Sequence, residues 1–184
     1  MVQIELAMKL MDALEGRRSV RRYDSRPVPK ALVLELLRAA EAAPSAGNLR
    51  ARKYIVVGRP DLRKALALAA YGQKQVEEAP ILIVVLADFD RSRTRYGDRG
   101  YLYAMLDAAS AITCLLLAAF DTGLGACWNG AFDDQMVKDL LRYSEDLVPV
   151  GIISLGWPLE SPPAPPRRSM EELVRWEMES REME

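Results

Sequence analysis

Apolar residues recur every three or four positions in several stretches of the chain, which is the spacing of one face of a helix. Ile4, Met8, Met11 and Leu14 follow this spacing and predict a first helix, which Gly16 ends. The same spacing, helped by capping residues and by prolines at first helical positions, predicts five further helices. They cover residues 29–43, 60–70, 101–121, 134–143 and 170–179.

Two other stretches are nearly unbroken apolar runs. "PILIVVLAD", residues 80–88, and "VPVGIISLGWP", residues 148–158, are typical of strands that are buried on both faces. Residues 53–58 predict a third strand, and "GLGACWNG" predicts a glycine-punctuated turn with a short extended piece. Residues 17–28 should be irregular, and "FDRSRTRYGDRG" should be a polar loop. We therefore expect a single α+β domain over residues 1–184, with a proline-rich extended arm at "LESPPAPPRR".

The helix predicted over residues 101–121 is apolar or small on nearly every face, so it should be buried all round. Two arrangements would bury it: the helix lies at the centre of the domain, or a partner subunit covers one side. The run of Ala and Ser at 108–111 would let another helix pack closely.

Composition narrows the possible classes of function. The chain has 184 residues, of which 50% are hydrophobic and 28% are charged, as in ordinary globular domains. A formal net charge of -1 offers no basic field for nucleic acid or anionic lipid. The chain contains no uninterrupted run of about 18 apolar residues, so we expect no membrane span. The acidic, amphipathic start is unlike a signal peptide. Two cysteines are too few for a disulfide framework, so we expect a reducing, cytoplasmic location.

The sequence contains no histidine, and this removes several mechanisms. Ser-His and Cys-His nucleophilic catalysis are excluded, as are zinc and haem sites with histidine ligands. Two cysteines cannot hold a structural zinc ion or an iron–sulfur cluster by themselves. We expect no metal site, and if the protein is an enzyme, a bound organic cofactor should carry its chemistry.

Arginines gather at two places that are far apart in the sequence. Four arginines fall within six residues of "EGRRSVRRYD", on either side of Ser19: Arg17, Arg18, Arg21 and Arg22. This is either a solvated basic stretch or a site for a phosphate ester, because arginine forks and a hydroxyl suit phosphate oxygens. A second pair follows the stiff proline-rich arm, so the two groups could converge on one phosphate.

Small residues mark two further positions. The stretch "PSAGN", residues 44–48, joins a helix to a strand, and small side chains let a backbone approach another group closely. In "NGAFD" the backbone N–H groups of Gly130 and Ala131 precede a helix and can donate to a ring atom. "GLGACWNG" lacks the Gly-Lys-Ser/Thr ending of a phosphate-binding loop, and no Gly-x-Gly-x-x-Gly follows a first strand.

Three stretches together resemble the nitroreductase family of FMN-dependent oxidoreductases. They are "RRSVRRYDSRPVPKALVLELLRAAEAAPSAGNLRARKYIVV", "DAASAITCLLLAAFDTGLGACWNGAF" and "GIISLGWPLESPPAPPRRSMEELV". The resemblance covers nearly the whole chain in the right order. It implies a central, mainly antiparallel sheet flanked by helices and a homodimer formed through the long helix. It also implies that the arm, from about 158 to 184, extends onto the partner subunit.

The resemblance also implies roles for single residues. Arg17, Arg18 and Ser19 match residues that hold the FMN phosphate and ribityl chain, and Arg167 and Arg168 match a basic pair that closes on the phosphate.

Other residues match positions around the flavin ring. Arg21 matches a basic position near the N1/O2 edge, where positive charge stabilises the anionic reduced flavin. Gln73 matches a polar position on the ring edge, and Gly130 and Ala131 match backbone positions that face N5 and O4. A loop that meets the flavin from the partner subunit matches Pro44, Ser45, Ala46 and Asn48.

The sequence departs from the family pattern after this loop. Family members often have Asn-x-Gln-Pro-Trp, whereas "NLRAR" places Arg50, Ala51 and Arg52 there, which changes the expected substrate-side wall. The stretch "RYGDRG", residues 95–100, either borders the active site or is a plain surface loop.

These features predict an enzyme in which NAD(P)H gives a hydride to FMN and a small-molecule acceptor then takes the electrons in a ping-pong cycle. Acceptors would be nitroaromatics, quinones or free flavins. No catalytic side chain is expected, because the flavin carries the redox chemistry. The alternatives are another flavin reaction on the same fold, such as dehalogenation, flavin reduction or flavin fragmentation, and a non-catalytic FMN-binding module.

Overall fold

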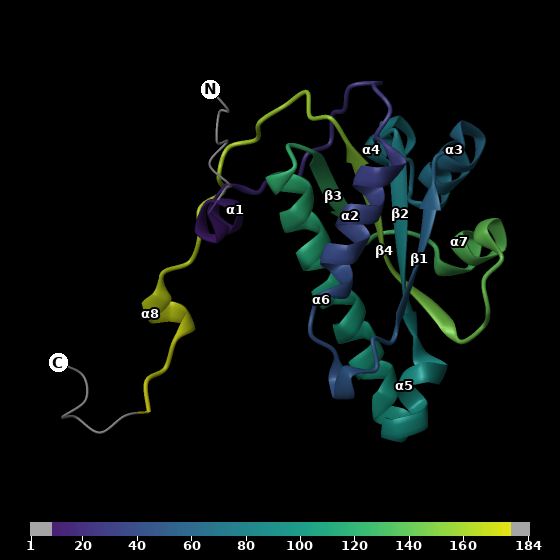
Figure 1. Cartoon of the computed structure of the whole chain (residues 1–184), viewed down its shortest axis with the longest axis vertical. Coiled ribbons are helices and arrows are strands. Elements are labelled where there is room, and N and C mark those ends of the chain that lie inside the picture. The colour runs from purple at the N-terminus through teal and green to yellow at the C-terminus, as the bar shows by residue number, and fades with distance from the viewer. Residues whose placement is uncertain (1–8, 178–184) are drawn as a thin grey trace.

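The computed structural model of the protein describes residues 9–177. Its centre is a four-stranded sheet with the order β1-β2-β4-β3, in which every neighbouring pair is antiparallel (Figure 1). The strands are β1 (Arg52–Val57), β2 (Ile81–Asp88), β3 (Gly125–Asn129) and β4 (Leu147–Gly156). The predicted α+β fold with a central antiparallel sheet is confirmed.

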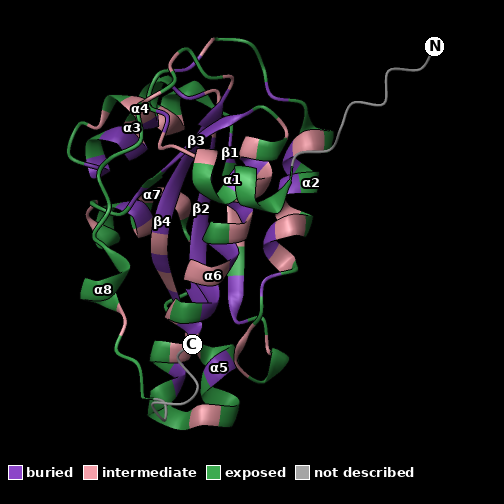
Figure 2. Ribbon diagram, turned by 90° about the vertical axis from the view of Figure 1, so that its left-hand side faces the viewer, coloured by how far each residue is buried: buried purple, intermediate pink, exposed green. Residues whose placement is uncertain are grey.

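Helices cover both faces of this sheet. One face carries α2 (Lys30–Glu41) and α6 (Gly100–Asp121), and the other carries α3 (Pro60–Ala69), α4 (Lys74–Glu78) and α7 (Asp134–Leu141). α1 (Leu10–Gly16) contacts α6 near its C-terminal end, and α5 (Phe89–Tyr96) leads into α6 through the turn η2 (Gly97–Arg99). The turn η1 (Ala46–Asn48) follows α2, and α8 (Met170–Leu173) lies in the C-terminal arm. Figure 2 shows that most of this arm is exposed.

The position of the central strands, with helices on both faces of the sheet, explains why their sequences are unbroken apolar runs. In β2, Ile83 and Val85 join the core beneath α2 and α6, whereas Leu82 and Val84 join the core beneath α3 and α7. All four side chains are fully buried. Alternate residues of a strand face opposite sides, so a strand that is covered on both faces must be apolar throughout.

The long helix α6 is buried on one side only. Ala108 and Ile112 are fully buried against the sheet and α2, but Leu102 is 48% exposed and Leu106 is 53% exposed. The prediction that this helix is buried all round is therefore wrong for a single chain. The helix also does not lie at the centre of the domain. Of the two arrangements considered from the sequence, only cover by a partner would bury this apolar face.

By length and composition alone, one helical stretch, Phe89–Asp121, could cross a membrane. In the structure this stretch consists of α5, η2 and α6, and its α6 part packs on the sheet. The absence of a membrane span stays a prediction.

Several predicted boundaries need correction. The polar loop expected at 89–100 is wrong, because residues there form α5 and η2. The Asp88 carboxylate accepts a hydrogen bond from the Arg91 N–H and caps α5, and Phe89 packs edge-on against Tyr101 with ring centroids 5.7 Å apart. The last predicted helix is also too long: α8 ends at Leu173, and the Ser169 side chain makes no capping hydrogen bond to it.

Other predictions differ by less. The short helix α4 was not predicted, and Pro29 lies at the N-cap of α2 and not at its first helical position. The first helix begins at Leu10 in the structure, while the part predicted at residues 4–8 lies outside the described residues. The Asp133 cap on α7 is confirmed, since its carboxylate accepts from the Met136 N–H at 2.8 Å.

Candidate functional site

The arginine-rich stretch leaves α1 and runs beside the edge strand β3. Ser19 forms an isolated parallel bridge with Ala126, and the Val20 N–H donates to the Ala126 carbonyl at 3.1 Å. Glycine at positions 16 and 125 allows this path, because neighbouring side chains pack closely against the backbone there. A Cβ on Gly16 would lie 2.8 Å from the Phe120 ring, and one on Gly125 would lie 2.7 Å from the Val20 side chain. The stretch is therefore held at the C-terminal end of α6.

A cleft of about 320 Å³ brings the two ends of the chain together. Its lining residues are Arg17, Arg18, Ser19 and Arg21 on one side and Pro162, Pro163, Pro165 and Arg167 of the arm on the other. Residues about 150 positions apart thus share one cationic cleft, as the two arginine groups in the sequence suggested. Arg168 is not among the residues that line it.

The polar groups of this cleft are only partly satisfied. Arg18 donates through Nη1 to the carbonyls of Glu15 and Arg17 at 2.7 and 2.8 Å, but its Nε is buried and has no hydrogen-bond partner within residues 9–177. The Arg21 backbone N–H donates to Glu160 Oε1 at 2.6 Å. A buried donor of a charged group without a partner is costly. A phosphate ester fits this cleft, because Arg17, Arg18 and Arg167 line it and their guanidinium groups can offer charge-assisted donors.

The residues predicted to face the flavin ring also come together. Gln73, at the start of α4, donates through Nε2 to the Ala131 carbonyl at 2.8 Å, so residues from two distant parts of the sequence meet. A Cβ on Gly130 would have only Trp128 Nε1 near it, at 4.0 Å, so the backbone at Gly130 faces open space. A flat ring could approach the chain there.

A buried polar network underlies this segment, and sequence reasoning missed it. Asn129 donates through Nδ2 to the Ile152 carbonyl at 2.7 Å and lies 3.2 Å from Ser154 Oγ, which lies 2.9 Å from the Tyr23 hydroxyl. The Tyr23 hydroxyl also donates to the Val20 carbonyl. Burial raises the pKa of Tyr23, so the hydroxyl remains a proton donor.

This network links the two parts of the candidate site. Val20 follows Ser19 of the cationic cleft, and Asn129 precedes Gly130, so the contacts run from one predicted flavin-binding segment to the other. Two polar residues within otherwise apolar strands, Ser154 and Asn129, were the sequence signal that could have revealed this network.

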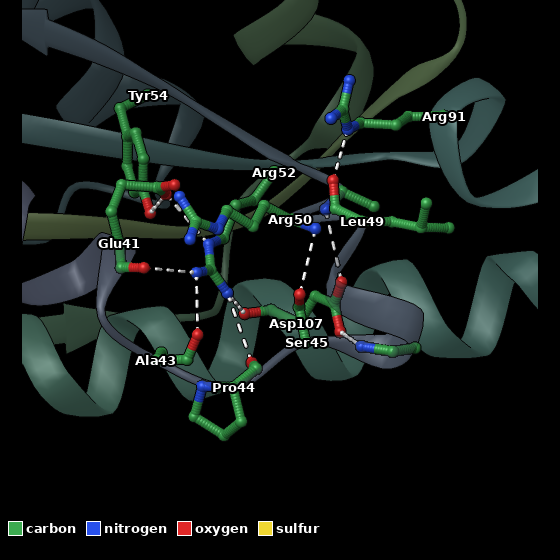
Figure 3. Close-up of polar contacts among 12 residues, drawn as sticks. Glu41, Ala43, Pro44, Ser45, Leu49, Arg50, Arg52, Tyr54, Arg91 and Asp107 are labelled. Atoms are coloured by element: carbon green, nitrogen blue, oxygen red, sulfur yellow. Dashed lines mark hydrogen bonds and ion pairs between the residues drawn. The ribbon is translucent and has the colours of Figure 1, made fainter.

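The loop at residues 44–50 lies at the other end of α6, and Figure 3 shows how it is held. The buried carboxylate of Asp107 accepts from the Ala46 N–H at 2.8 Å and from the Ala51 N–H at 3.2 Å. Within the loop, Ser45 Oγ accepts from the Arg50 N–H at 3.0 Å. An acidic residue in an otherwise apolar helix was the signal that could have identified Asp107.

Arg52 lies beneath this loop and not on a substrate-side wall. Its side chain is 0% exposed, and its Nε is 2.9 Å from Glu41 Oε1. It also donates to the carbonyls of Ala43 and Asp107, each at 3.1 Å (Figure 3). The Tyr54 hydroxyl donates to the same Glu41 oxygen at 2.7 Å, and burial together with this carboxylate raises the Tyr54 pKa. Arg52 thus ties the end of α2, the loop and α6 together.

Helix α5 contacts the outer side of the loop. Arg91 donates through Nε to the Leu49 carbonyl, and Arg95 Nη1 lies 3.4 Å from the Gly47 carbonyl oxygen. Gly47 has φ +56°, and a Cβ there would lie 2.6 Å from the Tyr96 hydroxyl. The segment 89–99 therefore contacts the loop at residues 44–50 and is not a plain surface loop.

Within one chain the loop and the cationic cleft are separated. Asp107 contacts the loop and Phe120 contacts the start of the arginine-rich stretch, which places these contacts about 20 Å apart along α6 at about 1.5 Å per residue. The structure therefore brings together Arg17, Arg18, Ser19, Arg21 and Arg167, and separately Gln73 and Ala131. It does not bring Pro44, Ser45, Ala46 or Asn48 to either group.

Comparison with known proteins identifies the family of the chain. The model of the nitroreductase family matches residues 14–79 and 69–157, which is most of the chain. The chain belongs to the nitroreductase family.

Relatives within the nitroreductase family cover nearly all of the chain. An NADH dehydrogenase of Thermus thermophilus is 30% identical over 204 residues, covering 94% of this chain and 100% of that protein. An oxygen-insensitive NADPH nitroreductase of Salmonella typhimurium is 30% identical over 172 residues, covering 89% of this chain and 72% of that protein. The structure of an NADPH:FMN oxidoreductase from Vibrio harveyi, complexed with NAD+, has a TM-score of 0.84 at 25% identity and covers 92% of this chain and 77% of that one. The nitroreductase fold expected from the sequence is confirmed.

Proposed function

We propose that the protein is an FMN-dependent oxidoreductase that uses NAD(P)H to reduce nitroaromatic, quinone or similar small-molecule acceptors. One observation carries the proposal: Arg17, Arg18, Ser19 and Arg167 line a single cleft in which Arg18 Nε is buried without a partner in the described part of the chain. Relatives with names that include NADPH nitroreductase and NADPH:FMN oxidoreductase support the same chemistry.

The side chains of the cleft would hold the cofactor by its phosphate. Arg17, Arg18 and Arg167 would donate charge-assisted hydrogen bonds to the phosphate, and Ser19 would contact the ribityl chain. Arg168 follows Arg167 in the arm and would join the phosphate site when the arm packs on a partner.

The ring would lie further along the edge strand β3. Gly130 and Ala131 leave room for a flat ring, and Gln73, fixed by its bond to the Ala131 carbonyl, would contact the ring edge. Arg21 would place positive charge near the N1/O2 edge, which favours the reduced, anionic flavin. Bound FMN would supply hydride acceptance from NAD(P)H and hydride or electron donation to the acceptor.

A homodimer would complete this site. The apolar face of α6 with Leu102 and Leu106 needs a cover, and the loop 44–50 lies too far from the cleft of its own chain. A partner would bring its Pro44, Ser45, Ala46 and Asn48 against the flavin. The single domain would then extend its arm, residues 158–184, onto that partner, in a cytoplasmic enzyme.

Steady-state assays test this function directly. The purified protein should be yellow, should release FMN on denaturation, and should oxidise NADH or NADPH continuously when a quinone or nitroaromatic acceptor is added. An absence of bound FMN would contradict the proposal. Bound FMN without steady NAD(P)H oxidation would favour the alternative, a non-catalytic FMN-binding module.

A further inference from the structure

Two arginines and two tyrosines form a compact group where α5 meets α6. We name it the Arg–Tyr cluster; its members are Arg95, Tyr96, Arg99 and Tyr103. The rings of Tyr96 and Tyr103 pack edge to face with centroids 4.7 Å apart. The Arg95 guanidinium carbon lies 5.7 Å from the Tyr96 ring centroid, and that of Arg99 lies 5.4 Å from the Tyr103 centroid. Each arginine therefore lies over a tyrosine ring.

The charges of this cluster are not neutralised. Neither Arg95 nor Arg99 forms an ion pair with another residue of the described range 9–177, and the nearby Asp98 pairs with neither of them there. Arg99 uses its Nε to donate to the Tyr103 hydroxyl at 3.2 Å. A guanidinium that stacks on a ring keeps its remaining N–H groups available at its edge. Both arginines are exposed, so an anion in solution can reach those groups.

The cluster borders the loop 44–50. A Cβ on Gly47 would lie 2.6 Å from the Tyr96 hydroxyl and 2.7 Å from Arg95 Nη1, so only the bare glycine backbone separates the cluster from the loop surface. A substrate that binds at the loop near Gly47 would therefore have the Arg95 guanidinium within reach, with that of Arg99 in the same cluster.

We propose that the Arg–Tyr cluster is an anion subsite that binds the phosphate or carboxylate group of a substrate at this loop. The inference rests on the proposed function in one respect, since it takes the loop to border the flavin of the partner. Two substrates offer this chemistry: NADPH through the phosphate on its adenosine ribose, and an aromatic acceptor through a carboxylate.

Equilibrium binding to the FMN-loaded, full-length protein tests the subsite without relying on turnover. Calorimetric titrations in phosphate-free buffer would compare NADP+ with NAD+ in one arm and nitrobenzoate with nitrobenzamide in the other. In the double variant Arg95→Gln/Arg99→Gln, the preference for the anionic member of at least one pair should fall about tenfold or more, as expected when hydrogen bonds to a charged group are lost. The arm that responds identifies the anion.

Arg93→Gln is the matched control, because Arg93 is exposed on the same helix and lies outside the cluster. It changes the net charge as each single substitution does, so it should leave both preferences unchanged. An equal loss in the control would indicate a long-range field and would overturn the subsite. A parent protein without any preference for the anionic probes would overturn it as well.

Thermal unfolding of each variant shows whether the fold is retained, since Arg95 also contacts the Gly47 carbonyl. A single Arg99→Gln variant, which leaves the Arg95 contact in place, should lose part of the same preference. Failure of the proposed function would look different: the parent would oxidise neither NADH nor NADPH, whatever its binding preferences.

Discussion

The two ends of α6 differ in how their polar groups are satisfied. At the loop end, Asp107 accepts from two backbone N–H groups, and Arg52 donates to carbonyls around the loop, all within the protein. At the arginine end, Arg18 Nε is buried without a partner in the described residues, and Arg17 and Arg167 face a cleft.

This contrast indicates which half of the site is built before the cofactor arrives. The loop end has its conformation fixed by internal bonds, including the left-handed Gly47, so it can act as a rigid wall. The arginine end has donors in excess, so a ligand should order it. The predictions below test each half of this contrast.

Loss of Arg52 should have the largest effect. In Arg52→Ala, the Glu41 carboxylate loses its ion-pair partner and the carbonyls of Ala43 and Asp107 lose their donor. The Glu41 side chain is 38% exposed, so water compensates part of the lost pairing, and the cost arises mainly from the buried carbonyls, at about 2–3 kcal/mol. Chemical denaturation should show a loss of that order in the free energy of unfolding.

A surface pair provides the control for Arg52. Arg59 and Asp61 also form an ion pair, but both side chains are largely exposed. Arg59→Ala should leave the denaturation midpoint unchanged. If both variants unfold like the parent, Arg52 does not hold the loop end together.

Added bulk in the loop should reduce activity without unfolding the protein. Ala46→Leu keeps the backbone bond to Asp107 but fills space on the wall that would face the flavin of the partner. Displacement of the reacting groups should lower NAD(P)H oxidation about tenfold or more. Ala42→Leu, at an exposed position at the end of α2, adds the same bulk and should leave the rate unchanged. Equal rates in parent and Ala46→Leu would mean that the loop does not border the flavin.

The sequence predicted the fold better than it predicted the helix and the buried polar contacts that hold the candidate site. The apolar runs at 80–88 and 148–158 identified β2 and β4, because a strand covered on both faces has no other composition. Helix α5 was missed because its stability depends on the Asp88 cap and on tertiary contact by Phe89, which periodicity does not contain. The sequence left the role of Arg52 open, because arginine is usually exposed, whereas here its side chain is buried and donates to backbone carbonyls.

The arginine end depends on polar groups within the sheet, and two buried serines allow a matched test. Ser154 Oγ lies 2.9 Å from the Tyr23 hydroxyl and 3.2 Å from Asn129 Nδ2, whereas Ser92 Oγ is buried without a partner in the described range. Ser154→Ala should lower the free energy of unfolding by about 1–2 kcal/mol. Ser92→Ala should lower it by less or raise it. A larger loss in Ser92→Ala would contradict this account of the network.

The smallest expected effect is a change in pH dependence at the loop end. Burial, the largest single influence, raises the pKa of Glu41, but hydrogen bonds from Tyr54 and Arg52 and the nearby arginine charges together lower it below its ordinary value of 4.5. A carboxyl whose pKa is lower in the folded protein stabilises the fold above its unfolded pKa, and this contribution is lost as the pH falls through the folded value.

Glu41→Gln should therefore remove part of the acid sensitivity. Between about pH 5 and pH 3, the free energy of unfolding should fall less steeply in the variant than in the parent. Equal slopes in urea denaturation across this range would show that the Glu41 carboxylate does not stabilise the loop end by its charge.

FMN affinity tests the central claim most directly, because the arginine end should need the cofactor phosphate. The FMN dissociation constant would be measured for the parent, for Arg17→Ala, for Arg167→Ala, and for Arg22→Ala as an exposed arginine outside the cleft. Loss of a charge-assisted phosphate contact should weaken binding roughly 10- to 100-fold in Arg17→Ala and Arg167→Ala, and Arg22→Ala should bind like the parent. Equal FMN affinity in all four proteins would contradict the account, because the cleft would then not be the phosphate site.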